Sequence, residues 1–246
     1  MKAVASIEAR MGSSRLPGKM MVDIAVKPAL ARVVERARAC RNVEAIVLAT
    51  TTAPEDDELA ALARKIGIAV HRGSEEDVLK RVLDAQAAQE SDLVIQICGD
   101  CPLLDPDIVD QAVSMFLGND CDVIAMGVQP SYPQGTEVQV FRLSALRYID
   151  AHTTDPAHRE HVSLYFHEHP DQFRPIHLMA PAALARPEQR LQLDYPEDLE
   201  VIRRIYGALE PQLGGAFRTA DILAYLDSHP DVARLNAHCE ERPARP

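Results

Sequence analysis

Short apolar runs of strand type alternate with helical patterns through the first half of the chain, and this rhythm limits the possible folds most. The strand-like runs are Ala3–Ile7, Ala45–Ala49, Ile68–His71 and Leu93–Ile97. The helical patterns between and after them cover Pro28–Cys40, Pro54–Ile66, Ser74–Gln89 and Pro106–Leu117. Consecutive strands joined by helices form right-handed parallel units. The sequence therefore predicts an α/β fold with a doubly wound, mainly parallel sheet.

The second half of the chain departs from this rhythm after about residue 127. We expect strands at Gly135–Phe141 and Phe173–Met179, and helices at Leu143–His152, His158–Glu168, Pro196–Ala208, Thr219–Asp227 and Val232–His238. Such a departure is typical of a substrate lobe near the strand ends, here residues 128–180, followed by a short helical tail over residues 209–246. Neither repeats nor a low-complexity linker interrupt the chain, so we expect a single domain over residues 1–246.

Charge and composition exclude several partners. The 246 residues carry 26 Lys and Arg against 37 Asp and Glu, a net charge of −11, with no Trp and 4% aromatic residues. Such a chain lacks the cations that neutralise a nucleic acid backbone and the aromatic rings that stack on bases, and an anionic membrane repels it. We therefore expect neither a nucleic acid polymer nor a membrane as a partner.

The cysteines and the N-terminus suit a cytoplasmic protein. A signal pattern does not follow Met1, and no apolar run approaches the roughly 20 residues that span a bilayer. The five cysteines are scattered and odd in number. Cys98 and Cys101 form one C-x-x-C pair without the second pair of a zinc site, so free thiols are expected.

Basic residues gather near the N-terminus. Residues 1–41 contain nine Lys or Arg and three Asp or Glu, a charge of +6, so the remaining residues carry −17. We expect Arg32, Arg36 and Arg38 to lie on the polar side of a helix and to carry no function.

The connection after the first strand predicts an anion site. Residues 9–19 read ARMGSSRLPGK, with three cations, two hydroxyls and two glycines. Small residues let backbone N–H groups approach an anion, while Arg and Lys neutralise it. The loop differs from a Walker A motif because five residues separate Gly12 from Gly18, and Met20 replaces the Mg²⁺-binding hydroxyl. A surface loop with solvated charges is the alternative.

Two aspartates follow apolar runs and are candidate metal ligands. Asp100 follows Gly99 at the end of the fourth strand-like run, and Asp194 ends the run that begins at Leu191. Ligands of open α/β sheets bind at the carboxyl ends of strands, and Mg²⁺ takes one or two protein carboxylates plus phosphate oxygens. The alternatives are a turn-stabilising carboxylate at Asp100 and an N-cap for the Pro196 helix at Asp194.

Three segments together resemble the cytidylyltransferase family, which includes the CMP-Kdo and CMP-acylneuraminate synthetases. They are the loop at residues 9–19, the GDCP turn at 99–102 and the DYPEDL segment at 194–199. The resemblance is closest to the spore coat polysaccharide biosynthesis protein F branch, because intermediate segments fit as well. Those segments are ATTTAPEDD at residues 49–57, RGSEEDVL at 72–79 and REHV at 159–162. The match covers roughly residues 3–208.

The resemblance implies a Rossmann-like nucleotidyltransferase fold, with a mixed, mainly parallel sheet and helices on both faces, in a homodimer that uses CTP and Mg²⁺. The nucleotide-binding residues would be Ala9, Arg10, Gly12, Ser13, Arg15, Lys19, Arg72, Ser74 and Cys98. Arg15, Lys19 and Asp100 would be catalytic, and Asp100 and Asp194 would bind Mg²⁺. Residues 128–180 would form an acceptor and dimer lobe, with acceptor contacts from Tyr132, Gln134, Gly135, Glu137, Arg159 and His161.

The expected reaction transfers CMP from CTP to an anionic acceptor with release of pyrophosphate, in surface polysaccharide or glycoconjugate biosynthesis. Sugar acids, sugar phosphates and phosphonates are the acceptor classes. Cys98 departs from the pattern, because the Kdo branch has Gln there, so the base preference rests on the branch analogy. The segment from Tyr132 to Val138 is either an acceptor wall or an ordinary hairpin, and His161 as a general base is a minority alternative.

Two other functions stay open. A sugar-nucleotide glycosyltransferase would use an Asp-x-Asp motif after a strand, and Asp120-Cys121-Asp122 has that form. It precedes the apolar run Val123–Met126, however, which favours a strand entrance. A non-catalytic homologue that only binds a nucleotide is the second alternative.

Overall fold

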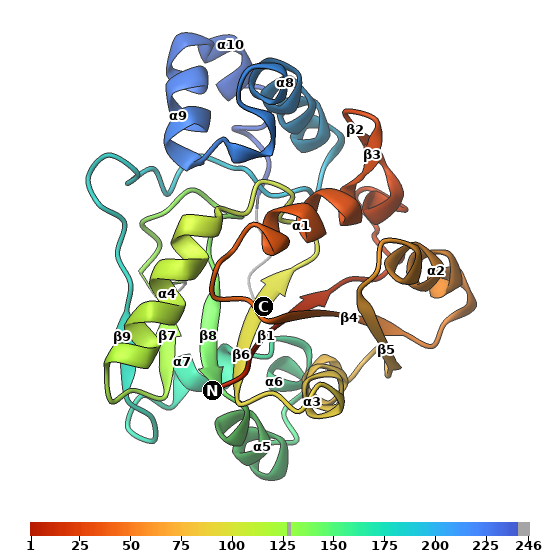
Figure 1. Ribbon diagram of the computed structural model, residues 1–246, viewed down its shortest axis with the longest axis vertical. Coiled ribbons are helices and arrows are strands. Elements are labelled where there is room, and N and C mark those ends of the chain that lie inside the picture. Colours follow the sequence, from red (N-terminus) through yellow and green to blue (C-terminus); the bar gives the residue numbers. More distant parts are fainter. Residues whose placement is uncertain (127–128, 241–246) are drawn as a thin grey trace.

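The computed structural model describes residues 1–126 and 129–240, and a mixed sheet of seven strands lies at the centre of this part (Figure 1). The strands in chain order are β1 (Ala3–Glu8), β4 (Ala45–Thr51), β5 (Ala69–Gly73), β6 (Leu93–Cys98), β7 (Val123–Ala125), β8 (Gln139–Arg142) and β9 (Pro175–His177). Their order across the sheet is β5-β4-β1-β6-β8-β7-β9, and among them β8 runs against the rest. The predicted fold class, a mixed and mainly parallel α/β sheet, is confirmed.

Helices cover both faces of this sheet. One face carries α1 (Ala29–Arg38), α2 (Asp57–Lys65) and α4 (Pro106–Gly118). The other face carries α3 (Val78–Ala88), α5 (Leu143–His152), α6 (Pro156–Glu160) and α7 (Leu164–Glu168). Successive side chains of a strand point to opposite faces, so in β1 Ala5 and Ile7 join one core and Val4 the other.

A third apolar core lies at the carboxyl end of the sheet. It joins α8 (Pro196–Leu213), α9 (Thr219–Ser228) and α10 (Pro230–Ala233) to the small hairpin of β2 (Asp23–Ile24) and β3 (Lys27–Pro28). Short 3₁₀ turns occur at Lys19–Met21, Pro54–Asp56 and Gly214–Ala216. This layer packs beside the turns that follow β1 and β6, where the sequence places its candidate residues.

Several predicted boundaries are wrong for local reasons. Helix α3 begins at Val78, not Ser74, because the Asp77 carboxylate accepts a hydrogen bond from the Lys80 amide and caps the helix. The helix expected at His158–Glu168 is two short helices, the first starting at Pro156 after its cap Asp155. The other boundary changes shorten β8 and β9, lengthen α8 to Leu213 and place the last helix at Pro230–Ala233.

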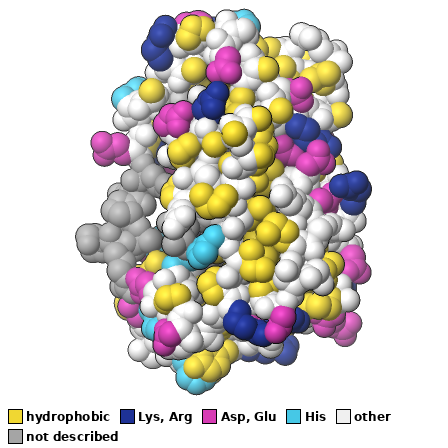
Figure 2. Space-filling view, turned by 90° about the vertical axis from the view of Figure 1, so that its left-hand side faces the viewer, with side chains coloured by type: hydrophobic (Ala, Val, Ile, Leu, Met, Phe, Trp, Pro, Cys, Tyr) yellow, Lys and Arg dark blue, Asp and Glu magenta, His cyan; other side chains and the backbone are white. Residues whose placement is uncertain are grey.

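The segment predicted as a lobe contributes to the sheet itself. Strands β8 and β9 extend the sheet beyond β6, and α5, α6 and α7 cover one face of it. The first residue of segment 128–180 and the last six of segment 209–246 lie outside the described residues. Figure 2 views the molecule from the side of β9 and shows apolar side chains gathered on this face between charged groups. The acceptor and dimer roles of this segment stay predictions.

Two of the three α1 arginines expected on the solvated side are buried, whereas Arg38 is exposed as predicted. Arg32 and Arg36 are 1% and 2% exposed. The Arg32 guanidinium pairs with Glu210 and donates to the carbonyl of Ile24, whereas Arg36 donates to the carbonyls of Leu104, at 2.7 Å, and Phe217, at 2.8 Å. These contacts fasten α8 and the turn before α9 to α1, a tertiary role that helical periodicity does not reveal.

Candidate active site

The candidate site lies where the strand order reverses. The chain runs from β1 outward through β4 to β5, and then returns to β6 on the other side of β1. Ligands of open α/β sheets bind at this switch point. The Gly99 amide donates to the carbonyl of Glu8 at 2.8 Å, and a Cβ on Gly99 would lie 2.7 Å from the Cβ of Ala9. Glycine is therefore required for the two connections to meet.

Lys19 lies between the two candidate metal ligands. Its Nζ is 2.7 Å from Oδ2 of Asp100 and 2.7 Å from Oδ1 of Asp194. The Leu193 amide also donates to the carbonyl of Asp100 at 2.8 Å, which joins the third segment to the second. Burial lowers the pKa of Lys19, but Asp100 and Asp194 outweigh it and hold the pKa above its usual value. The three segments singled out in the sequence thus converge on one ammonium group.

Arg15 completes this cluster from the same loop as Lys19. Its Nη2 is 2.8 Å from Oδ2 of Asp194, and its guanidinium lies over the Tyr195 ring at 5.0 Å. Burial by itself raises the pKa of Asp194, but Lys19, Arg15 and Arg190 hold it below its usual value. Nη1 of Arg15 is buried and has no hydrogen-bond partner among the described residues. A buried, unpaired guanidinium N–H is a ready donor for an anionic ligand.

The loop around these cations has a defined shape. Gly18 has a positive φ of 68° and its amide donates to the carbonyl of Met11 at 3.3 Å, which closes the loop. The Ser13 hydroxyl accepts from the Leu16 amide at 3.3 Å. Met20, expected in place of a Mg²⁺-binding hydroxyl, is 1% exposed and packs in the core.

Other predicted nucleotide-binding residues lie outside this cluster. Arg10 pairs with Glu75 at 3.0 Å, and the neighbouring Gly12 is exposed. The Ser74 hydroxyl accepts a hydrogen bond from the Asp77 amide. Arg72, on β5, donates to the carbonyls of Thr51 and Ala53 and pairs with Asp57. Cys98, by contrast, lies at the site. It is exposed, and it ends β6 opposite Glu8, the last residue of β1.

The predicted acceptor residues do not form one open wall. Tyr132 is 1% exposed and lies in the core. Arg159 is occupied by Asp150 and by two backbone carbonyls, and half-buried His161 ends α6. Gln134 accepts a 3.3 Å hydrogen bond from Arg190.

Gly135 and Glu137 belong to the tight turn before β8. Gly135 has a positive φ of 89°, and a Cβ there would lie 2.8 Å from the Gln192 amide nitrogen. Its own amide donates to the Glu137 carboxylate at 2.9 Å. Gly135 therefore allows this turn to pack on the strand-like segment that leads to Asp194.

Arg190 and Asp198 form a buried ion pair behind Asp194. Arg190 Nε is 2.9 Å from Oδ1 of Asp198, and Nη2 is 3.0 Å from Oδ2 of Asp194. The second Asp198 oxygen accepts from the amides of Asp194 and Tyr195, both at 2.9 Å. This network orients the Asp194 carboxylate. Sequence patterns did not predict this network, because a lone Arg before an apolar run carries no local signal.

Glu8 is a second residue at this site that sequence patterns did not predict. It ends β1 directly opposite Cys98 of β6, and Gln96 donates to its carboxylate at 3.2 Å. Burial raises the pKa of Glu8 to about 7, although the Gln96 hydrogen bond and Arg81 lower it. A carboxylate directly after an apolar strand run was the available signal, the same one that singled out Asp100.

Replacement of Glu8 by Gln should change how stability depends on pH. Because the folded pKa of about 7 exceeds the ordinary 4.5, the folded protein binds more protons than the unfolded chain between these values. Stability therefore falls as pH rises through this window and is then constant. Glu8→Gln removes this penalty. The free energy of unfolding of the variant minus that of the wild type should therefore be up to about 3 kcal/mol larger above pH 7 than below pH 4.5.

Urea unfolding across this pH range measures the difference, with the exposed Glu58→Gln variant as the control. Parallel stability curves for the wild type and Glu8→Gln would show that Glu8 titrates normally.

The acidic pair before β7 has a structural role. Asp120 and Asp122 both pair with Arg174, and the Asp122 amide donates to the Arg174 carbonyl at 3.0 Å. Val123 then begins β7, which pairs with β9. The geometry is that of a strand entrance, as expected, and it disfavours the glycosyltransferase alternative.

Comparisons with known proteins decide the family. The profile of the family described as Cytidylyltransferase matches residues 4–221. The spore coat polysaccharide biosynthesis protein SpsF of Bacillus subtilis is 31% identical over 92% of this chain and 95% of its own length. The chain belongs to the cytidylyltransferase family. The predicted resemblance is confirmed. As a member of this family, the protein is a nucleotidyltransferase enzyme.

Solved structures agree with this assignment. A cytidylyltransferase from Leptospira borgpetersenii matches with a TM-score of 0.89 and 29% identity, over 99% of both chains. A CMP:2-keto-3-deoxy-manno-octonic acid synthetase complexed with CTP matches with a TM-score of 0.63 and 21% identity, over 84% of this chain and 99% of its own. The latter likeness supports the fold alone. Within residues 1–126 and 129–240, none of the helices is long and apolar enough to cross a bilayer.

Proposed function

We propose that this cytidylyltransferase transfers CMP from CTP to a small anionic acceptor and releases pyrophosphate. The observation that carries the proposal is the cluster at the switch point, where Lys19 and Arg15 lie against Asp100 and Asp194. It combines cations that hold phosphates with carboxylates that hold a metal ion. The unpaired Nη1 of Arg15 adds a donor for the triphosphate.

The donor set at this site fits Mg²⁺. Asp100 and Asp194 each place a carboxylate oxygen 2.7 Å from the same ammonium nitrogen, so one cation reaches both side chains. Mg²⁺ prefers oxygen ligands and takes one or two carboxylates together with substrate phosphates. When bound, Mg²⁺ would neutralise charge on the α-phosphate and polarise it. Lys19 would then be free to hold the phosphates.

In the proposed mechanism the protein positions the substrates and stabilises charge. The acceptor oxygen forms a bond to the α-phosphorus while the bond to the bridging oxygen of the pyrophosphate breaks, roughly in line. Arg15 and Lys19 offset the negative charge that grows on the departing pyrophosphate. Asp100 and Asp194 orient Lys19 and would hold the Mg²⁺. This reaction requires no covalent intermediate with a protein nucleophile.

The names of the relatives support an anionic sugar-type acceptor. A polysaccharide biosynthesis protein and several proteins named 3-deoxy-manno-octulosonate cytidylyltransferase are similar to this chain. We propose that the acceptor is a sugar acid, sugar phosphate or phosphonate, and that the product serves surface polysaccharide or glycoconjugate biosynthesis. We also propose a cytoplasmic homodimer, in keeping with the family.

Pyrophosphate release tests this function directly. The purified chain is incubated with Mg²⁺, each of CTP, UTP, ATP and GTP, and one member of each acceptor class. CTP with one anionic acceptor should release pyrophosphate, and omission of Mg²⁺ should stop the reaction. Tight CTP binding without turnover across all acceptors would favour the non-catalytic alternative. Release from UTP, ATP or GTP in preference to CTP would overturn the base assignment.

A further inference from the structure

The segment after α10 returns to the turn that carries Asp194. Asn236 is 1% exposed, and its side-chain nitrogen donates to Oδ1 of Asp198 at 2.8 Å and to the Arg190 carbonyl at 3.1 Å. Four residues later, the Glu240 carbonyl accepts a hydrogen bond from the Tyr195 hydroxyl at 3.2 Å. Residues 236–240 are therefore anchored at both ends against the start of α8.

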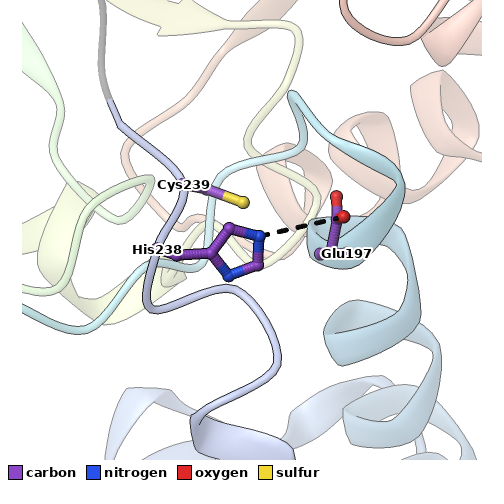
Figure 3. A group of neighbouring side chains, drawn as sticks. All are labelled: Glu197, His238 and Cys239. Atoms are coloured by element: carbon purple, nitrogen blue, oxygen red, sulfur yellow. Dashed lines mark ion pairs between the residues drawn. The ribbon is translucent and has the colours of Figure 1, made fainter.

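Three possible metal ligands meet between these anchors. Glu197 comes from the first turn of α8, and His238 and Cys239 come from the anchored segment (Figure 3). One donor atom from each lies within 4.8 Å of the other two, and His238 Nε2 is 3.9 Å from Oε1 of Glu197. Figure 3 shows the three side chains turned toward one another. Such a site joins two parts of the chain about 40 residues apart.

We propose that Glu197, His238 and Cys239 bind a thiophilic divalent cation of the Zn²⁺ class, which clips the C-terminal segment onto the start of α8. Thiolate, imidazole and carboxylate together are typical zinc ligands, whereas Mg²⁺ prefers oxygen alone. With zinc–ligand distances of about 2.0–2.3 Å and tetrahedral angles, two ligands of one ion lie about 3.3–3.6 Å apart. The donor atoms must therefore move together by about 1 Å, and the exposed His238 side chain has room to rotate.

The anchors make this site more than a chance cluster. Asn236 and Glu240 already hold the backbone on either side of His238 and Cys239, so little conformational entropy remains to be lost when an ion binds. Among the described residues, no other trio of His, Cys, Asp or Glu donor atoms lies this close. The site is separate from the Lys19 cluster and does not depend on the proposed reaction. Three protein ligands leave a fourth position for water.

Metal titration of the full chain tests the proposal, with Mg²⁺ present throughout to occupy oxygen sites. Zn²⁺ and Co²⁺ should each bind at one ion per chain, and Co²⁺ should produce a thiolate charge-transfer band. Cys239→Ser should abolish this band and weaken Zn²⁺ binding at least about tenfold, and His238→Ala and Glu197→Gln should weaken it similarly. Zn²⁺ should also slow hydrogen exchange in residues 236–240.

Two controls separate this site from other thiols and imidazoles. Cys98→Ser tests the C-x-x-C pair, and His229→Ala removes another exposed imidazole before the segment. Both variants should keep the Co²⁺ band and the Zn²⁺ affinity. The proposal is overturned if Cys98→Ser loses the band or if Cys239→Ser retains it. Equal Zn²⁺ affinity in the wild type and Cys239→Ser would reduce the cluster to an exposed ion pair between His238 and Glu197.

Discussion

Asp100→Asn should lower the rate of pyrophosphate release by at least about a hundredfold, because in the proposed mechanism this carboxylate would hold the metal ion that offsets the charge of the phosphates. Asn keeps the size of the side chain but cannot balance Lys19 or hold Mg²⁺ as a carboxylate does. Lys19 retains its 2.7 Å contact with Asp194, so the fold should survive the change. Turnover is measured over a range of Mg²⁺ concentrations, together with thermal unfolding.

Asp107→Asn is the matched control for this experiment. Asp107 lies in the first turn of α4, its side chain is 63% exposed, and Arg218 contacts it at the surface. Its variant should keep wild-type turnover. Near-normal kinetics in Asp100→Asn would remove Asp100 from the mechanism. Loss of turnover accompanied by loss of the cooperative unfolding transition would show a structural role instead.

Arg190→Met should lower the free energy of unfolding by about 3–5 kcal/mol, because it leaves the buried Asp198 carboxylate without its cation and removes one of the three cations around Asp194. Arg190 is 3% exposed, and its two acidic partners, Asp194 and Asp198, are 2% and 0% exposed. Met preserves most of the side-chain volume, so the loss reports the charge and not a cavity. Urea denaturation at neutral pH measures the change.

A second substitution tests the cause of this loss. Asp198→Asn in the Arg190→Met background removes one unpaired charge and should recover part of the stability. The control is Arg204→Met, whose exposed partner Glu200 lies one turn away on α8, and it should cost less than about 1 kcal/mol. An equal cost for Arg204→Met and Arg190→Met would contradict the assigned burial effect.

The parts of the site that sequence patterns predicted are those that follow strands. Lys19 and Asp100 lie in the connections directly after β1 and β6, and Asp194 ends the segment before α8. Parallel strands bring their carboxyl ends to one edge, so residues far apart in sequence were expected to meet there. The same rule applied to the end of β1 would have found Glu8. The β-α alternation likewise predicted the parallel part of the sheet.

The errors share a cause as well. Periodicity assigned Arg32 and Arg36 to a solvated face because it measures polarity along one helix and ignores what packs against it. In the folded chain α8 and the turn before α9 cover that face and accept the hydrogen bonds of these side chains. Arg159, which the family resemblance places at the acceptor, is paired with Asp150 and with backbone carbonyls, and its acceptor role stays a prediction.

Local patterns and short motifs are enough to predict the α/β class, the family and the loop that supplies Arg15 and Lys19. Which charged side chains meet depends instead on the folded arrangement of the chain. That arrangement places Lys19 between Asp100 and Asp194, buries Arg190 against Asp198 and brings His238 and Cys239 to Glu197. The physical reason is that an ion pair depends on distance and burial, which the fold sets between segments that share no local sequence signal.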